Sequence, residues 1–128
     1  MVVDDNVDAA EMLAEALRVA GHVVGVAHDG PAALSLVDDF RPELALLDIG
    51  LPVMDGFDLA QRLKSRLSTS PPKFVAVTGY GQASDRARTK QAGFDEHLVK
   101  PIDLARLNAI VSTLERHSDA PRADGPVS

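Results

Sequence analysis

The chain has 128 residues, a formal net charge of −6 and no cysteine. This length predicts one domain that is large enough to bury a core. The acidic balance argues against nucleic acid or an anionic membrane surface as a partner, and the lack of cysteine excludes disulfides and thiolate metal sites. Because residues 1–5 are no signal peptide and no apolar run reaches membrane-spanning length, we expect a cytoplasmic protein, and we interpret it as a monomer.

In chain order, short apolar runs alternate with amphipathic stretches. Val2–Val3 predicts the end of a first strand. Because this run is so short, we expect the given sequence to begin inside that strand. The stretch 7–20 is typical of a helix, because its apolar residues recur at spacings of three and four. The face expected to point inward is Ala9, Met12, Leu13, Ala16, Leu17 and Ala20. Residues 23–27 predict a second strand, and Pro31 marks the first turn of a second helix.

The segment Leu44–Asp48 is the centre of the predicted fold. Its apolar residues run without interruption and end in a carboxylate, while Pro42 and Pro52 confine the segment to strand length. A strand that is buried on both faces indicates a parallel sheet with helices on each side. Ligands of such sheets bind beyond the carboxyl ends of the strands, so Asp48 is the first candidate for a functional residue.

The second half of the chain repeats the alternation. A helix follows Asp55-Gly56, and Asp103 is suited to cap the last helix, whereas residues 118–128 have nothing to bury and are expected to be disordered. Residues 1–117 thus form one domain of five β-α units, in which right-handed crossovers favour an open, doubly wound parallel sheet. The remaining elements are strands at 74–77 and 97–99 and a weakly apolar helix at 83–92.

Polar side chains end four of the five predicted strands. If the first strand lies beside the third, three carboxylates converge and need a compensating cation. Lys100 supplies one positive charge, and Mg²⁺ suits a site with few carboxylates and several waters. A carboxylate nucleophile, a metal and a lysine fit phosphoryl transfer, although each residue taken singly is more often a helix cap or a turn former. These strand-end residues are Asp4, Asp5, Asp48, Thr78 and Lys100.

Four segments together resemble the signature segments of response-regulator receiver domains, which act in two-component phosphorelays. The resemblance covers residues 2–116, and it implies a flavodoxin-like fold with five strands in the order 2-1-3-4-5. It also implies a phosphoacceptor that gains and loses its own phosphoryl group, rather than a turnover enzyme. The four segments are Val2-Val3-Asp4-Asp5-Asn6, Leu46-Leu47-Asp48-Ile49-Gly50-Leu51-Pro52-Val53-Met54-Asp55-Gly56, Val77-Thr78-Gly79 and Val99-Lys100-Pro101.

The resemblance assigns a role to each strand-end residue. Asp48 is implied as the phosphoacceptor, Thr78 as a hydrogen-bond partner of the phosphoryl group, and Lys100 as the partner of Asp48 and then of the phosphate. The implied donor is a phosphohistidine on a histidine kinase or on a histidine phosphotransfer domain. The implied ligands of Mg²⁺ are Asp4, Asp5, Asp48 and the backbone carbonyl of Gly50.

Two further features follow from comparison with the family pattern. His97 stands where the family usually has a Tyr or Phe that swings inward after phosphorylation, so His97 and Thr78 are the candidate switch residues. The alternative is that His97 is merely a half-buried polar ring on an edge strand. The Lys100-Pro101 bond is expected to be cis, because Lys100 must turn back over the site directly after a strand.

Gly50 and Tyr80 border the expected path of the water that would hydrolyse an aspartyl phosphate. Gly50 has no side chain to orient that water, and the Tyr80 ring is able to cover the entrance. We therefore expect the phosphorylated chain to turn over slowly. The alternative is that Tyr80, which lies between two glycines, points to solvent.

The larger protein is less defined. The short first strand, the loose tail, Gly79-Tyr80-Gly81 and residues 92–98 favour a receiver from a hybrid histidine kinase, and a freestanding single-domain regulator is the alternative. A phosphohydrolase with an aspartyl nucleophile is a distant rival, since it needs a second Asp where this chain has Gly50. A flavin-binding module is equally weak, because Asp4-Asp5-Asn6 would repel a phosphate in the absence of a metal.

Overall fold

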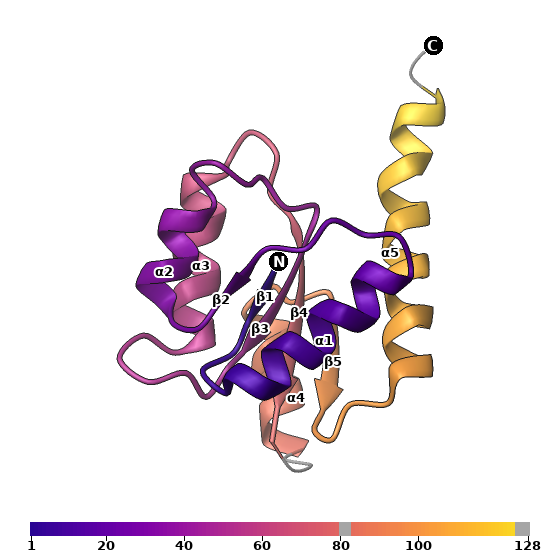
Figure 1. Cartoon of the computed structure of the whole chain (residues 1–128). Helices are drawn as coiled ribbons and strands as arrows, with labels where there is room; N and C mark the ends of the chain where they lie inside the picture. Colours follow the sequence, from indigo (N-terminus) through magenta and orange to yellow (C-terminus); the bar gives the residue numbers. More distant parts are fainter. Residues whose placement is uncertain (80–82, 125–128) are drawn as a thin grey trace.

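The chain folds into a five-stranded parallel sheet with strand order β2-β1-β3-β4-β5, which confirms the predicted fold class (Figure 1). The computed structural model describes residues 1–79 and 83–124, without the side chains of 83–86 and 115–124. The strands are β1 (Val2–Val3), β2 (Val26–Ala27), β3 (Leu44–Asp48), β4 (Lys73–Thr78) and β5 (Glu96–Val99).

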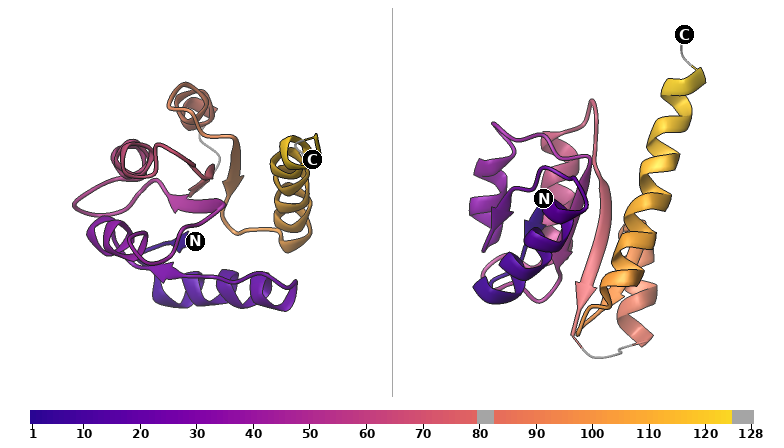
Figure 2. Two further views of the ribbon diagram at one scale, coloured as in Figure 1. Left: turned by 90° about the horizontal axis from the view of Figure 1, so that it is seen from above. Right: turned by 45° about the vertical axis from the view of Figure 1, so that its right-hand side comes forward.

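Helices cover both faces of the sheet (Figure 2). One core lies between the sheet and α1 and α5, and a second core lies between the sheet and α2 and α3. Because side chains alternate along a strand, Leu46 of β3 packs in the first core and its neighbour Leu47 in the second. The helices are α1 (Val7–Val19), α2 (Gly30–Leu36), α3 (Gly56–Arg66), α4 (Ala83–Gln91) and α5 (Leu104–Asp124).

The second strand is shorter than the sequence predicts. We expected residues 23–27 to be extended and paired, but β2 contains only Val26 and Ala27. These two residues pair with Val2 and Val3, which are the whole of β1. Since a strand is defined by its partner, the two-residue β1 leaves the first part of the predicted strand without a ladder to join.

The buried face of α1 is also different from the predicted one. The buried residues are Ala10, Leu13, Ala14 and Leu17. Leu13 and Leu17 were expected there, but Met12 is 63% exposed and was wrongly placed in the core. The predicted face combined Leu13 and Leu17 with Ala9 and Ala16, whereas the buried face combines them with Ala10 and Ala14. Both sets of residues recur at spacings of three and four, so the spacing alone does not identify the buried face.

The last helix begins where the sequence predicts but continues further. Asp103 Oδ1 accepts a hydrogen bond from the Ala105 N–H at 2.9 Å, as expected for a capping residue. The helix then runs to Asp124 and extends past the rest of the molecule, although disorder was expected from residue 118 (Figure 1). Extending a formed helix adds one hydrogen bond for each residue that is fixed, so a helix can continue beyond the residues that pack against the sheet. The domain boundary at 117 stays a prediction.

No helix in the described ranges, α5 included, combines the length and the apolar character needed to cross a membrane.

Gly56 allows the first turn of α3 to lie directly against the end of β3. A Cβ at this position would come within 2.6 Å of the Ile49 Cα and 2.8 Å of the Asp48 carbonyl oxygen. We expect Gly56→Ala to lower the free energy of unfolding by about 2–4 kcal/mol, measured by urea denaturation, because backbone must move. Gly79→Ala is the matched control, since its Cβ would meet none of the described residues within 4 Å. Equal losses in both variants would contradict the proposed close approach.

Candidate functional site

The carboxyl ends of four strands bring the predicted site residues to one edge of the sheet. Asp4 and Asp5 follow β1, Asp48 ends β3, Thr78 ends β4, and Lys100 follows β5. The parallel register aligns these ends, because Val3 pairs with Leu47, Asp48 with Val77, and Thr78 with Val99. The predicted convergence of polar strand ends is therefore what the structure shows.

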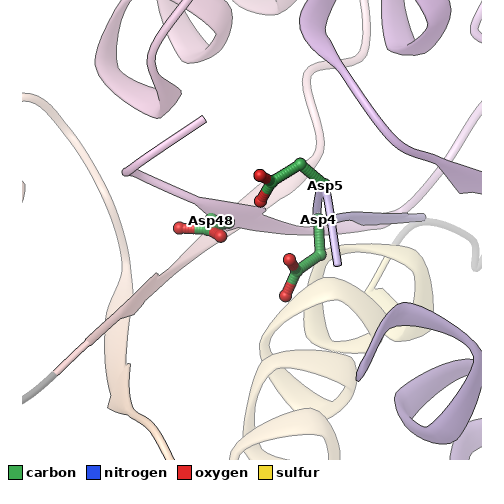
Figure 3. A group of neighbouring side chains, drawn as sticks. All are labelled: Asp4, Asp5 and Asp48. Carbon is green, nitrogen blue, oxygen red and sulfur yellow. The ribbon is translucent and has the colours of Figure 1, made fainter. Parts of the chain in front are cut away.

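Three carboxylates form a compact acidic group at this edge (Figure 3). One oxygen from each of Asp4, Asp5 and Asp48 lies within 4.8 Å of the others. Asp4 and Asp48 are buried and Asp5 is exposed, so the group opens to water on the Asp5 side. Such a donor set fits a hard divalent cation that binds oxygen at about 2.0–2.1 Å and keeps several waters, which is the behaviour of Mg²⁺.

Lys100 holds the two buried carboxylates together. Its Nζ lies 3.1 Å from Asp4 Oδ2 and 3.2 Å from Asp48 Oδ2. Burial lowers the pKa of the Lys100 ammonium, but the hydrogen bonds and charges of the two carboxylates outweigh burial, so the pKa is raised overall. The Lys100-Pro101 bond is cis, as predicted, and the Lys100 N–H donates to the Thr78 carbonyl at 2.8 Å.

Asp48 is oriented through both of its carboxylate oxygens. The Gly50 N–H donates to Oδ1 at 2.9 Å, and Lys100 donates to Oδ2. Burial raises the pKa of Asp48, and the charge of Asp4 raises it further, while the Gly50 hydrogen bond and Lys100 act in the opposite direction; the net shift is upward. The carboxylate is thus a desolvated group whose negative charge is only partly compensated by the protein.

Thr78 is linked to a polar chain that leads away from the acidic group. Thr78 Oγ1 lies 3.1 Å from His97 Nε2, and His97 Nδ1 lies 3.2 Å from Thr89 Oγ1 on α4. All three side chains are buried. His97 therefore points inward and is no half-buried edge ring, whereas Thr89 was missed by the sequence analysis. The sequence offered little to identify Thr89, because it is a polar residue in a helix whose expected apolar positions are all alanines.

The two residues that were expected to set the lifetime of the phosphoryl group differ in what the structure describes. Gly50 is exposed, and a Cβ built on it would lie 3.5 Å from Asp48 Oδ1. A side chain at position 50 would therefore border the carboxylate, and the effect of Gly50 on the lifetime stays a prediction. Tyr80 lies outside the described residues.

The profile of the response regulator receiver domain matches residues 1–112. With this match over most of the chain, and with the fold and acidic group above, the chain belongs to the response regulator receiver domain family. Its acidic group of Asp4, Asp5 and Asp48 is the acidic pocket typical of receivers.

Two curated relatives and one solved structure indicate how far the similarity reaches. An uncharacterized 14.6 kDa protein of Leptolyngbya boryana is 34% identical over 111 residues, which are 87% of this chain and 85% of that protein. The transcriptional regulatory protein PrrA of Mycobacterium leprae is 36% identical over 120 residues, 94% of this chain but 51% of its own length. The receiver domain of NtrX from Brucella abortus superposes with a TM-score of 0.80 at 29% identity, covering 88% of this chain and 94% of that domain. The chain thus spans about half the length of the curated transcriptional regulators it matches.

Proposed function

We propose that this domain accepts a phosphoryl group on Asp48 from a phosphohistidine. In the proposed step a carboxylate oxygen of Asp48 attacks phosphorus, a P–O bond forms as the P–N bond breaks, and the electron pair of that bond returns to the imidazole, which takes up a proton. The observation that carries the proposal is the position of Asp48. It is buried at the end of the central strand, inside the acidic group, with one oxygen held by Gly50 and the other by Lys100.

The surrounding residues have complementary proposed roles. Lys100 holds the Asp48 carboxylate before transfer and neutralises phosphoryl oxygens afterwards, which its position between two carboxylates supports. Thr78 is proposed to donate its hydroxyl proton to the phosphoryl group, because it ends the strand next to Asp48. Such positioning and charge neutralisation account for most of the catalysis in phosphoryl transfer.

Mg²⁺, when bound, would neutralise the charge that develops on the transferred phosphoryl group. We propose that Asp4, Asp5 and Asp48 hold it, since one oxygen of each is available within a small volume. The backbone carbonyl of Gly50 is a further proposed ligand from the family pattern.

The proposed partner is a histidine kinase or a histidine phosphotransfer domain in the cytoplasm. The sequence favoured a hybrid histidine kinase as the larger protein, but the curated relatives reported above do not support that interpretation. We propose a freestanding regulator instead, and the support is the Leptolyngbya boryana protein, of which the chain covers 85%. The similarity to transcriptional regulators supports a receiver within a longer protein as the second candidate.

Intact mass spectrometry after incubation with acetyl phosphate and Mg²⁺ tests the proposed function. We expect a gain of one phosphoryl mass that hydroxylamine removes, because an acyl phosphate is cleaved by this nucleophile. An aspartyl phosphohydrolase would release phosphate continuously without a stable adduct, and a flavin-binding module would show visible absorbance. The absence of any adduct in the native chain would refute the proposal.

We expect Gly50→Asn to shorten the lifetime of the phosphorylated domain about three- to tenfold. The new amide would lie beside the Asp48 carboxylate, where it can orient the attacking water in line with the departing oxygen. The measurement is the decay of adduct mass after the donor is removed. Gly50→Ala is the matched control, because it adds a Cβ without a polar group, and we expect its decay to match the native rate. An unchanged decay of Gly50→Asn would show that position 50 does not set the lifetime.

A further inference from the structure

A histidine ring connects the acidic group to the second strand. His28 directly follows β2, and its Nδ1 lies 3.0 Å from the backbone carbonyl oxygen of Asp4. The ring is half-buried, and His28 is not one of the predicted site residues. It is therefore a neighbour of the proposed cation site whose role is still to be assigned.

The carbonyl that His28 contacts belongs to the peptide unit between Asp4 and Asp5. A peptide unit is planar, so the direction of its carbonyl also fixes the N–H and the Cα of the next residue. The Asp4 N–H donates to the Ala27 carbonyl at 3.1 Å, which continues the pairing of β1 with β2. With His28 on its carbonyl, Asp4 is held at both ends of its backbone, and the Asp5 side chain starts from a defined position.

His28 is itself held between two secondary-structure elements. The residue before it, Ala27, ends β2 and is buried. The residue after it, Asp29, caps α2 by accepting a hydrogen bond from the Ala32 N–H at 2.7 Å. Asp5, in contrast, is exposed and lies in the bend between β1 and α1. The His28 ring is thus a rigid support for a less rigid part of the site.

The contact requires a proton on Nδ1 of His28. A carbonyl oxygen only accepts hydrogen bonds, so the ring must donate, as the neutral Nδ1–H form and the doubly protonated ring both do. The neutral Nε2–H form would turn the Nδ1 lone pair toward the lone pairs of the Asp4 carbonyl. The geometry therefore predicts which ring nitrogen carries the proton.

The position of Asp5 matters because Asp5 supplies the exposed carboxylate of the acidic group (Figure 3). Its oxygen must stay within 4.8 Å of oxygens of Asp4 and Asp48 for all three to face one cation. Asp4 and Asp48 are buried, and Lys100 lies 3.1 and 3.2 Å from their oxygens. Asp5 is placed instead by its backbone, and that backbone begins at the peptide unit held by His28.

We propose that His28 is a positioning residue for the divalent cation. By donating Nδ1–H to the Asp4 carbonyl, it orients the peptide unit so that the Asp5 carboxylate faces the cation. In this role His28 touches neither the cation nor the phosphoryl group. The inference rests on the proposed cation site and extends it to the connection between β2 and α2. Groups that hold a metal ligand, rather than the metal, affect metal affinity strongly.

The first test is the Mg²⁺ affinity of the unphosphorylated chain, measured by isothermal titration calorimetry. His28→Leu has no donor, and we expect it to raise the Kd for Mg²⁺ about three- to tenfold, as for the loss of one hydrogen bond. His28→Asn should restore near-native affinity, because its Nδ2 amide is as many bonds from the backbone as Nδ1 of histidine. A His28→Leu Kd equal to the native one overturns the proposal, as does an equal loss in His28→Asn.

Phe94→Leu is the control for general destabilisation. The Phe94 ring packs edge-on against Phe57 and Phe74, each at 6.0 Å between ring centroids, so the variant loses core packing. Phe94 precedes β5 and so lies at the edge of the sheet opposite the acidic group. We expect Phe94→Leu to lower thermal stability and to keep the native Kd for Mg²⁺. A Kd raised as much as in His28→Leu would show that affinity follows stability, and would overturn the proposal.

The second test separates a role at the cation from a loss of folded protein. Initial rates of phosphorylation by acetyl phosphate are measured over a range of Mg²⁺ concentrations. We expect His28→Leu to reach the native maximal rate but to need about three- to tenfold more Mg²⁺ for half of it. A purely structural role would lower the maximal rate and leave the half-saturating concentration unchanged, and that result overturns the proposal.

The third test reads the ring form of His28 directly. Long-range ¹H–¹⁵N correlation spectra of the histidine-labelled chain distinguish protonated from unprotonated ring nitrogens, and His28→Asn assigns the signals. We expect a protonated Nδ1. A neutral ring with its proton on Nε2 overturns the proposal.

The two proposals fail in distinguishable ways. A native chain that gains no phosphoryl mass refutes the proposed function, whereas His28 is still judged on the calorimetric Mg²⁺ affinities. A native chain that binds no Mg²⁺ overturns the role of His28, whatever its phosphorylation. A native chain that is phosphorylated, with a Mg²⁺ affinity equal to that of His28→Leu, refutes the role of His28 alone.

Discussion

Asp48→Asn is expected to abolish the gain of phosphoryl mass from acetyl phosphate. An amide is a far weaker nucleophile than a carboxylate, and Asp48 is the one of the three clustered carboxylates that ends the central strand. The measurement is intact mass at a donor concentration that saturates the native chain. Asp39→Asn, which changes an exposed carboxylate in the turn after α2, is the matched control and should retain full yield. A full-yield adduct on Asp48→Asn would place the acceptor elsewhere.

The same substitution is expected to stabilise the fold when no divalent cation is present. Burial raises the pKa of Asp48, which means that its ionised form is less favourable in the folded state than in the unfolded chain. The free energy of unfolding should therefore fall as pH rises from the ordinary carboxyl value of 3.8 through the raised native pKa. Removing the charge should therefore raise the free energy of unfolding at neutral pH.

Thermal unfolding in EDTA measures this effect. Asp48→Asn should unfold at a higher temperature than the native chain at pH 7, and the difference should shrink as the pH is lowered and the native carboxylate takes up a proton. Added Mg²⁺ should shrink it too, because the native chain then gains more from the cation. A lower unfolding temperature for Asp48→Asn at pH 7 would show that Lys100 and Gly50 more than compensate the buried charge.

The parts of the site that sequence reasoning found are those that depend on strand ends. A buried strand in a parallel sheet has an unambiguous pattern, and its carboxyl end has a defined place in the fold. This is why Asp48, Thr78 and Lys100 were located before their contacts were known. The cis bond before Pro101 was anticipated from the resemblance to receiver domains together with the need for Lys100 to return toward the same edge.

The parts that were missed depend on which side of a helix faces inward. In α1 the alanines on either side of Leu13 and Leu17 offered two equivalent faces, so Met12 was wrongly placed. In α4 the expected apolar positions carry only alanines, and Thr89 gave no hydrophobic signal to orient the helix. Its buried hydroxyl becomes meaningful only beside His97, and that contact joins elements whose packing is decided by the tertiary structure.

A similar reason explains the differences at the ends of elements. The extent of β2 depends on the length of β1, with which it pairs, and the local sequence of β2 does not contain this information. The extent of α5 depends on helix propagation beyond Leu114, the last residue whose burial is described. Local composition predicted a strand in the first case and disorder in the second, because it contains no information about neighbours.

Asp5→Asn is expected to raise the Mg²⁺ concentration that gives half-maximal phosphorylation by about tenfold or more, while the acceptor itself stays intact. Asp5 is the exposed member of the acidic group, so its carboxylate faces the side from which a hydrated cation enters. Asp4 and Asp48 are instead tied to Lys100 and would respond to substitution through that ion pair as well. Asp5 is therefore the position at which the cation's contribution is best separated from that of the protein.

The measurement is the initial rate of phosphorylation by acetyl phosphate over a range of Mg²⁺ concentrations, with Mg²⁺-dependent thermal stabilisation as a second readout. Asp5→Asn removes one carboxylate ligand, and losses in or around a metal's ligand shell reduce affinity about 10–100-fold. Asp8→Asn is the matched control, because Asp8 is an exposed carboxylate in the first turn of α1 and lies outside the acidic group. We expect Asp8→Asn to follow the native Mg²⁺ curve, and Asp5→Asn to be slow at low Mg²⁺ and to recover as Mg²⁺ is raised. If the Asp5→Asn curve coincides with the native one in both readouts, Asp5 is no ligand, and the cation is held by the buried pair alone.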